Sequence, residues 1–297
     1  MKPKYLYRLG ILVPSSNTTM EPLISFMVQD LNKFMPWVSI ITHFSRVKVT
    51  QITSSPSADS QFALESMLSA ASLLADAQVN IIGWGGTSAG WLGIDTDTEF
   101  CRAVEKQFGI PAYSSTLALF QQLKTLQLDS VGLITPYTST LNDAITRNFA
   151  AAGVRTVTSY QPLNLTNNIE IGNVLTQDLE TPILQVVTAD PTLCAATTFC
   201  TNLQAAHVAR RWEEKYNVWV LDSVTSLIWG LFWTLRLDPR SSYMGEKWGR
   251  IFLREPIGVR LKAAIGISKL KPWGGEPTVP NVTSVTTTEP RQFVFRR

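Results

Sequence analysis

Two stretches of similar sequence decide the fold: Ile81-Ile-Gly-Trp-Gly-Gly86-Thr87-Ser88 in the first half of the chain and Ala195-Ala-Thr-Thr-Phe-Cys200-Thr201-Asn202 in the second half. Each is an apolar run that ends in a small residue and continues with threonine and a short polar residue. Such runs are typical of the buried strands of a parallel sheet. The two copies differ at one chemically decisive position, because Cys200 offers a thiol where Gly86 offers only backbone.

Short apolar runs alternate with helical patterns along most of the chain, which predicts α/β architecture with parallel sheets covered by helices. We expect strands at Arg8–Val13, Val38–His43, Val79–Trp84, Val131–Thr135, Val154–Ser159, Cys194–Phe199 and Val218–Leu221. We expect helices near Thr19–Asn32, Ser60–Ala77, Thr96–Phe108, Thr116–Leu126, Thr140–Ala152, Ile169–Thr188, Thr201–Tyr216 and Thr225–Leu235.

The alternation itself is repeated. Leu9-Gly-Ile-Leu-Val-Pro14 matches Val131-Gly-Leu-Ile-Thr-Pro136 at an offset of 122 residues (136 − 14), and Ser114 matches Ser223 at an offset of 109 (223 − 114). A repeated order of motifs predicts two similar structural units. We therefore expect two pseudo-symmetric lobes, each a parallel sheet covered by helices, with the active site in the cleft between them. Ligands of open α/β sheets bind beyond the carboxyl ends of the strands, where these motifs fall.

The repeat also suggests the division of the chain. We expect residues 1–115 and 224–252 to form the first lobe and residues 116–223 to form the second. Residues 253–297 read as a C-terminal extension, expected to be partly disordered, because the pattern weakens and the sequence becomes rich in proline, glycine and threonine.

Composition excludes several classes of function. The net charge is only +3 and 16% of the residues are charged, so nothing indicates binding to nucleic acid or to a membrane. The chain has no apolar stretch of membrane-spanning length and no secretory signal, so we expect a cytoplasmic protein. Its three cysteines lack metal-ligand spacing, so no metal site and no disulfide framework are expected. Assembly into a homo-oligomer stays open.

Four motifs in order give a more specific indication. Val13-Pro14-Ser15-Ser16-Asn17-Thr18-Thr19-Met20-Glu21, Gly86-Thr87-Ser88, Thr135-Pro136-Tyr137 and Cys200-Thr201-Asn202 together resemble the aspartate/glutamate racemase superfamily, in the branch of maleate cis–trans isomerases and arylmalonate decarboxylases. The resemblance covers roughly Tyr7 to Phe252. It implies a cleft between two lobes, a small carboxylate or dicarboxylate substrate and no cofactor.

The resemblance also implies which residues carry the chemistry. Racemases and isomerases of this group have one cysteine in each lobe, and here the second-lobe position is Cys200 and the first-lobe position is Gly86. Two-base racemisation needs an acid/base group on each face of the carbon, and the isomerase reaction needs a thiolate nucleophile, which by resemblance is the first-lobe cysteine. Decarboxylation needs one acid that returns one proton to an enediolate. A free thiol with a pKa of about 8.5 is protonated at neutral pH, so Cys200 fits that task.

The enediolate needs donors, and we expect Thr87, Ser88 and Tyr137 to supply them, with Cys200 as the acid. Further substrate contacts are expected at Pro14, Asn17, Gly86, Asn168, Thr201 and Asn202. Ordinary structural roles compete with these interpretations: Asn17, Thr87 or Ser88 could cap helices, Tyr137 could be a surface tyrosine, and a lone cysteine is usually a small buried apolar residue. We expect Cys101, Cys194, His43 and His207 to be structural. Lining of an aryl pocket is an alternative for Trp84, Trp91, Trp229 and Trp233, but we expect core packing to explain most of them.

Three hypotheses follow. The leading one is a cofactor-independent decarboxylase of a malonate-like dicarboxylic acid. The alternative is a cis–trans isomerase or racemase of a small carboxylic or dicarboxylic acid that uses another first-lobe base. The third is a carboxylate-binding protein that has kept the cleft without the reaction. The difference between Gly86 and Cys200 also predicts that Gly86→Cys creates some two-base racemisation.

Overall fold

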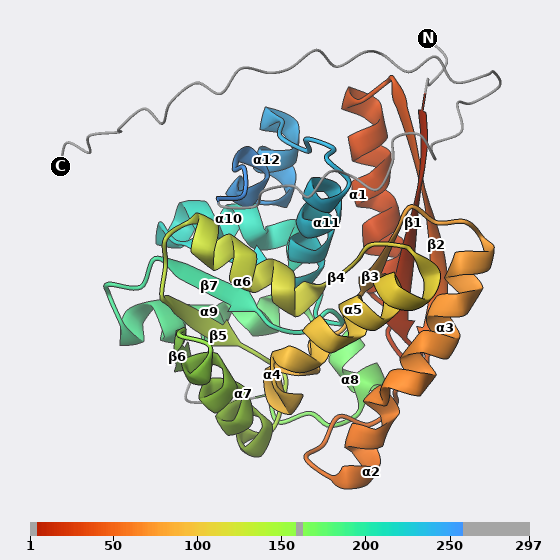
Figure 1. The fold of residues 1–297 in the computed structure, drawn as a ribbon. Coiled ribbons are helices and arrows are strands. Elements are labelled where there is room, and N and C mark those ends of the chain that lie inside the picture. Colours follow the sequence, from red (N-terminus) through yellow and green to blue (C-terminus); the bar gives the residue numbers. More distant parts are fainter. Residues whose placement is uncertain (1–4, 159–162, 258–297) are drawn as a thin grey trace.

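The computed structural model describes residues 5–158 and 163–257 and has the expected two-lobed α/β architecture (Figure 1). Its two parallel sheets of four strands have the strand orders β2-β1-β3-β4 and β6-β5-β7-β8. The strands are β1 (Tyr5–Pro14), β2 (Val38–Val47), β3 (Ile81–Trp84), β4 (Ala112–Ser114), β5 (Ser130–Ile134), β6 (Arg155–Thr158), β7 (Ala195–Thr198) and β8 (Trp219–Asp222).

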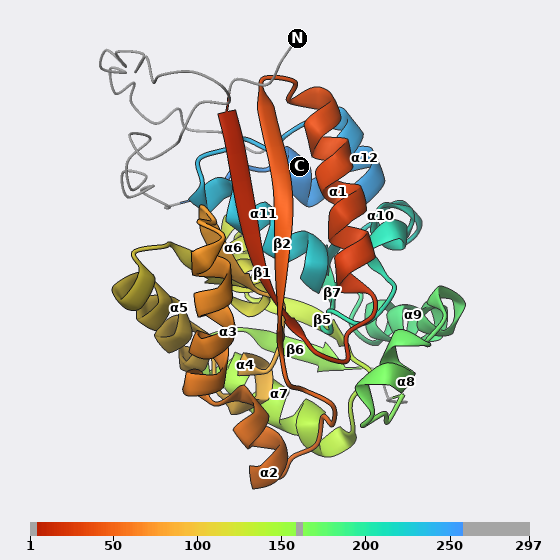
Figure 2. The ribbon, with the colours of Figure 1, turned by 90° about the vertical axis from the view of Figure 1, so that its right-hand side faces the viewer.

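Helices cover both sheets. The α-helices are α1 (Met20–Phe34), α2 (Pro56–Asp59), α3 (Leu64–Asp76), α4 (Ala89–Leu92), α5 (Asp95–Phe108), α6 (Ser115–Thr125), α7 (Ser139–Ala151), α8 (Asn168–Gly172), α9 (Glu180–Ala189), α10 (Ala209–Tyr216), α11 (Ser223–Thr234) and α12 (Ser242–Trp248). Four 3₁₀ turns are η1 (Ser60–Phe62), η2 (Thr176–Leu179), η3 (Ala206–Val208) and η4 (Arg250–Leu253). Figure 2 shows β1 and β2 with α1 on one side and α3 on the other.

Strand pairing confirms the repeat between the halves. Gly10 of β1 pairs with Ile82 of β3, and Gly132 of β5 pairs with Ala196 of β7. These equivalent pairs give an offset of 122 on the central strand (132 − 10) and 114 on its neighbour (196 − 82). The second offset is also that between Gly86 and Cys200, so the two residues occupy equivalent strand ends.

The match of Ser114 with Ser223, expected from the sequence, is wrong by one residue. Ala112 pairs with Ile82 and Val220 pairs with Ala196, so the offset here is 108 (220 − 112) and not 109. The residue equivalent to Ser114 is therefore Asp222. Both cap the helix that follows, because a side-chain oxygen of each accepts hydrogen bonds from backbone N–H groups of the first helical turn.

Helix α11 connects the halves. Its residues from Ser223 to Trp233 are all buried, and it contacts α6, β3 and β4. A helix that is apolar all round belongs in the interior of a protein. By contrast, α12 contacts α10, while its Lys247 donates to Asp30 of α1 at 2.6 Å. The contacts of α11 with β3 and β4 support the proposal that the chain returns to the first lobe after residue 223, whereas α6 and β8, which it also contacts, belong to the range expected for the second lobe.

Two expected helices are shorter than the sequence pattern indicated. The stretch Ile169–Thr188 forms α8, η2 and α9, and α9 begins so that Pro182 lies in its first turn, where the missing N–H costs nothing. The stretch Thr201–Tyr216 is helical only from η3 onward, and Thr201 and Asn202 form hydrogen bonds with the first lobe instead. Within the described ranges no helix is long and apolar enough to cross a membrane. The expected C-terminal extension lies outside the described residues from position 258 onward.

Candidate active site

One pocket lies at the carboxyl ends of β1, β3, β5 and β7, where both lobes meet. It is lined by nine of the residues expected from the sequence: Pro14, Asn17, Gly86, Thr87, Ser88, Tyr137, Asn168, Cys200 and Thr201. Four further residues that the sequence analysis did not assign to the site complete the lining: Val49, Ile52, Phe62 and Trp91. Asn202 is not in the lining.

The pocket is narrow, with an empty volume of about 290 Å³ between its lining residues. The residues around Ile52 bridge the lobes at this point, since the Ile52 N–H donates to the carbonyl of Thr166 at 2.8 Å.

The first-lobe wall presents unused donors. Within the described chain the backbone N–H groups of Gly86, Thr87 and Ser88 donate to no protein acceptor, and the same holds for the Ser88 hydroxyl. The hydroxyl oxygens of Thr87 and Tyr137 lie 2.9 Å apart. Burial raises the pKa of the Tyr137 hydroxyl well above its ordinary value, so this group stays protonated and can donate. Convergent neutral donors of this kind suit a carboxylate that gains charge in a reaction.

Cys200 supplies the only pocket-lining thiol among the described residues. It follows β7 and is almost completely buried. Burial raises the pKa of its thiol to about 11, although hydrogen bonds from Tyr137 and from the backbone N–H groups of Asn202 and Leu203 favour the thiolate. The charge of Asp222 raises it further. At neutral pH Cys200 is therefore a thiol, which is a proton donor and not a ready nucleophile.

A buried carboxyl group lies behind this cysteine. Asp222 accepts a hydrogen bond of 2.7 Å from Thr198, which precedes Cys200 by two residues, and caps α11 through Val224 and Thr225. The Ser223 hydroxyl donates to the Thr198 carbonyl at 2.9 Å. These bonds fix the end of β7 and thereby the position of Cys200. Burial raises the pKa of Asp222 to about 6.

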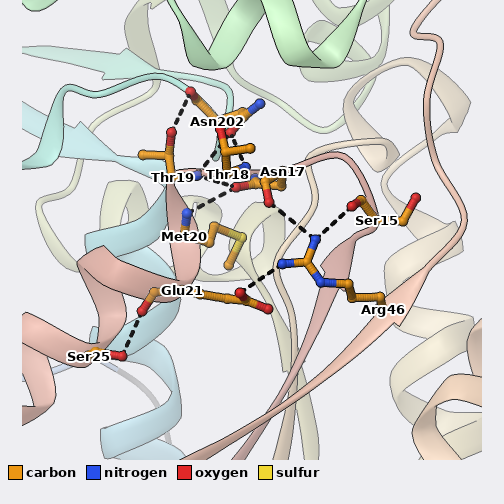
Figure 3. A network of polar contacts seen from close by, with 9 residues as sticks. All are labelled: Ser15, Asn17, Thr18, Thr19, Met20, Glu21, Ser25, Arg46 and Asn202. Atoms are coloured by element: carbon orange, nitrogen blue, oxygen red, sulfur yellow. Dashed lines mark hydrogen bonds and ion pairs between the residues drawn. The ribbon is translucent and has the colours of Figure 1, made fainter.

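Asn17 combines a helix cap with a bond between the lobes. Its side-chain oxygen accepts from the N–H groups of Thr19 and Met20 at 3.0 and 2.9 Å, as Figure 3 shows. Its side-chain nitrogen donates to Thr201 at 3.2 Å, and Thr201 donates in turn to the carbonyl of Gly85 at 2.9 Å. Asn17 and Thr201 thus hold the two halves of the pocket together in addition to lining it.

The side chain of Asn202 links the two lobes through hydrogen bonds. Its side-chain oxygen accepts from the N–H groups of Thr18 and Thr19 at 3.0 and 3.2 Å (Figure 3), and its nitrogen donates to the Asn168 carbonyl at 2.6 Å. The polar atoms of its side chain thus have protein partners. Asn168 in turn donates to Ser16 at 3.0 Å, so α8 is bound to the first lobe.

The remaining wall is apolar and aromatic. The ring of Trp91 contacts those of Phe62 and Tyr137 edge-on, with centroid distances of 5.6 and 5.4 Å. Phe62, Val49 and Ile52 come from the segment between β2 and α3, which carries no motif. Their place in the pocket is set only by tertiary packing, so no sequence signal identified them.

The other candidate groups lie elsewhere. Cys194 is exposed, and neither it nor Cys101 lines the pocket. His207 meets Thr176 at 3.3 Å, and it does not line the pocket either. Among the described residues no cluster of three or more histidine, cysteine, aspartate or glutamate side chains could hold a metal ion.

Comparisons with known proteins place the chain in a family and a fold. The family model of arylmalonate decarboxylase matches residues 52–248. A maleate isomerase of Geobacillus stearothermophilus is 26% identical over 239 residues, which cover 78% of this chain and 92% of the relative. A second maleate isomerase, of Alcaligenes faecalis, is 28% identical over 172 residues, or 56% of this chain and 66% of that protein.

Solved structures share the fold. The maleate isomerase of Pseudomonas putida S16 with maleate superimposes with a TM-score of 0.71 at 19% identity, covering 84% of this chain and 98% of that one. An arylmalonate decarboxylase superimposes with a TM-score of 0.61 at 17% identity, covering 84% and 100%. The chain therefore belongs to the arylmalonate decarboxylase family, in the branch of the aspartate/glutamate racemase superfamily that also contains the maleate isomerases.

Proposed function

We propose that this protein is a cofactor-independent decarboxylase of a malonate-like dicarboxylic acid, with Cys200 as its single proton donor. One observation carries the proposal: at two equivalent strand ends, the pocket has a buried protonated thiol at Cys200 and no side chain at Gly86. A reaction that needs one acid on one face fits this pocket better than one that needs groups on both faces.

The proposed mechanism uses the two walls differently. One carboxylate binds to the free N–H groups of Gly86, Thr87 and Ser88 and to the hydroxyls of Ser88 and Tyr137. The other lies against Val49, Ile52 and Phe62, where loss of hydration favours its departure as neutral carbon dioxide. The bond between this carboxylate and Cα breaks, and its electron pair forms the enediolate on the retained carboxylate.

Cys200 then completes the reaction. Its S–H proton passes to Cα of the enediolate, which gives a monocarboxylic acid and a thiolate. The thiolate recovers its proton from water after the product leaves. The backbone N–H groups of Asn202 and Leu203 favour the thiolate during this interval, and the Tyr137 hydroxyl does so once the product has left. Thr198 and Asp222 act as positioning residues for the cysteine.

The maleate isomerase relatives favour a second candidate, isomerisation of a small unsaturated dicarboxylate. In that reaction a thiolate adds to the double bond, rotation follows, and the thiolate leaves. Here Cys200 would have to be that thiolate. With a pKa of about 11, only about one Cys200 side chain in 10⁴ is ionised at pH 7, which argues against this role.

One paired assay separates the candidates. The protein is incubated with alkyl- and aryl-substituted malonates and with maleate, while carbon dioxide release and fumarate formation are measured. We expect carbon dioxide release that is lost in Cys200→Ala and kept in Cys194→Ala, since Cys194 is exposed and outside the pocket. Fumarate without carbon dioxide would establish the isomerase instead, and stabilisation by a ligand that is never turned over would indicate a binding protein.

A further inference from the structure

Position 86 faces the indole of a tryptophan. Trp84 is the last residue of β3 and is fully buried. A Cβ atom on Gly86 would lie 2.2 Å from Cζ2 and 2.4 Å from Cε2 of the Trp84 ring. Because real Cβ atoms essentially never come closer than 3.0 Å to another heavy atom, any side chain at position 86 requires the indole to move.

The indole has little room to move. It contacts the ring of Phe62 edge-on at a centroid distance of 6.4 Å and packs in a core cluster that includes Leu12, Phe100 and Val104. Protein interiors are close-packed, so a large buried ring cannot shift without displacing its neighbours. Phe62 itself lines the pocket, which places Trp84 directly behind the first-lobe wall.

We propose that Trp84 is a specificity-determining residue: its indole occupies the space of a side chain at position 86, so that the first lobe contributes only backbone there and Cys200 remains the single proton donor. The inference rests on the proposed function for its chemical meaning. It also changes the expectation for Gly86→Cys, because a cysteine at this position collides with Trp84 unless residue 84 becomes smaller.

A thermodynamic cycle tests the steric coupling without reference to activity. Melting temperatures are measured for Gly86→Ala, Trp84→Met and the double variant, with methionine chosen because its flexible side chain fills irregular gaps. We expect Gly86→Ala to lower the melting temperature by about 5 °C in the parent chain, as an overpacked core does. In the Trp84→Met background, Gly86→Ala should leave the melting temperature almost unchanged. An equal fall in melting temperature in both backgrounds would overturn the proposal.

A second measurement tests the chemical consequence. Gly86→Cys and Trp84→Met/Gly86→Cys are incubated with 2-phenylpropionate in heavy water, and deuterium at Cα is measured. A thiolate on one face removes the Cα proton, and a deuterated thiol on the opposite face returns a deuteron to the enediolate, so atoms balance without a redox step. We expect at least tenfold faster exchange in the double variant than in Gly86→Cys, and loss of exchange when Cys200→Ala is added.

The outcomes are distinct. Equal exchange in the single and double variants, or none in a folded double variant, would overturn the role assigned to Trp84. Trp84→Leu provides a second background if the methionine variant does not fold. Failure of the parent chain to release carbon dioxide from any malonate would refute the proposed decarboxylase and leave the stability cycle unaffected.

Discussion

The hydroxyl oxygens of Thr87 and Tyr137 lie 2.9 Å apart, one from each lobe, on the wall of the pocket. Tyr137 also lowers the pKa of the Cys200 thiol. A single phenol thus connects the first-lobe donors with the second-lobe acid. This contact links substrate binding to the protonation of Cys200.

Removal of the Tyr137 hydroxyl should affect both the reaction rate and the pKa of Cys200. We expect Tyr137→Phe to lower kcat/KM for the decarboxylated substrate by about 10²-fold, as loss of one oxyanion donor does. The pKa of Cys200 should rise further, because the hydrogen bond from Tyr137 lowers it. Steady-state kinetics measure kcat/KM, and the pH dependence of thiol alkylation measures the pKa of Cys200. Tyr216→Phe, whose hydroxyl meets Glu180 outside the pocket, serves as the control; an equal loss there would contradict the assignment.

Asp222→Asn should lower the pKa of Cys200 below about 11, because the charge of Asp222 raises it. Asparagine keeps the helix cap, so the position of the cysteine is retained. Since the thiol must be protonated to act as the acid, the variant should lose activity at lower pH than the parent chain. Alkylation of each cysteine against pH, followed by mass spectrometry, gives the shift directly. An unchanged alkylation profile would exclude this electrostatic role.

Asp97 should make stability depend on pH. Burial raises its pKa to about 7. The folded state therefore holds a proton that the unfolded state has lost between about pH 4 and pH 7, and the free energy of unfolding falls as the pH rises through this window. Relative to Asp97→Asn, the parent chain should lose about 3 kcal/mol between about pH 5 and pH 8. Chemical denaturation of both proteins at both pH values checks this, and parallel pH profiles would contradict it.

Asn202→Ala should weaken the hydrogen bonding between the two lobes and lower the free energy of unfolding. It removes the side-chain acceptor of the Thr18 N–H and the donor to the Asn168 carbonyl, while the Thr19 N–H keeps Asn17 as an acceptor. The expected cost is about 3 kcal/mol in the free energy of unfolding. KM should rise as well, because the pocket is formed from both lobes. Gln204→Ala is the matched control: Gln204 follows in the same loop and donates to the Gly172 carbonyl, but it is exposed. Its cost should stay within about 1 kcal/mol, measured by the same denaturation experiment.

Much of the fold was predictable because it depends on local pattern. The apolar runs gave seven of the strands, and the repeat gave the equivalence of Gly86 and Cys200 that strand pairing confirms. The misaligned anchor shows the limit of such matching. Ser223 resembles Ser114 in type, but the equivalent residue is Asp222, because serine and aspartate cap a helix equally well.

The site was predictable only where motifs end strands. Nine of the residues proposed from the sequence line the pocket, whereas Asn202 bonds across the lobes instead of lining it. Phe62 and Trp91 were not assigned to it, because an aromatic residue in a loop or a short helix has the same sequence signature whether it lines a pocket or fills the core. The collision between Gly86 and Trp84 also needs three-dimensional structure, since adjacent strand-end residues do not reveal where an indole lies.

The shared strand order of the two sheets has an evolutionary consequence. In a symmetric dimer of identical halves, every substitution at a strand end appears twice, so both walls of a shared pocket change together. When the halves are joined in one chain, each wall can vary alone. A glycine on one side and a cysteine on the other is a combination that a symmetric dimer of identical halves could not encode, whereas a single chain with two unequal halves can.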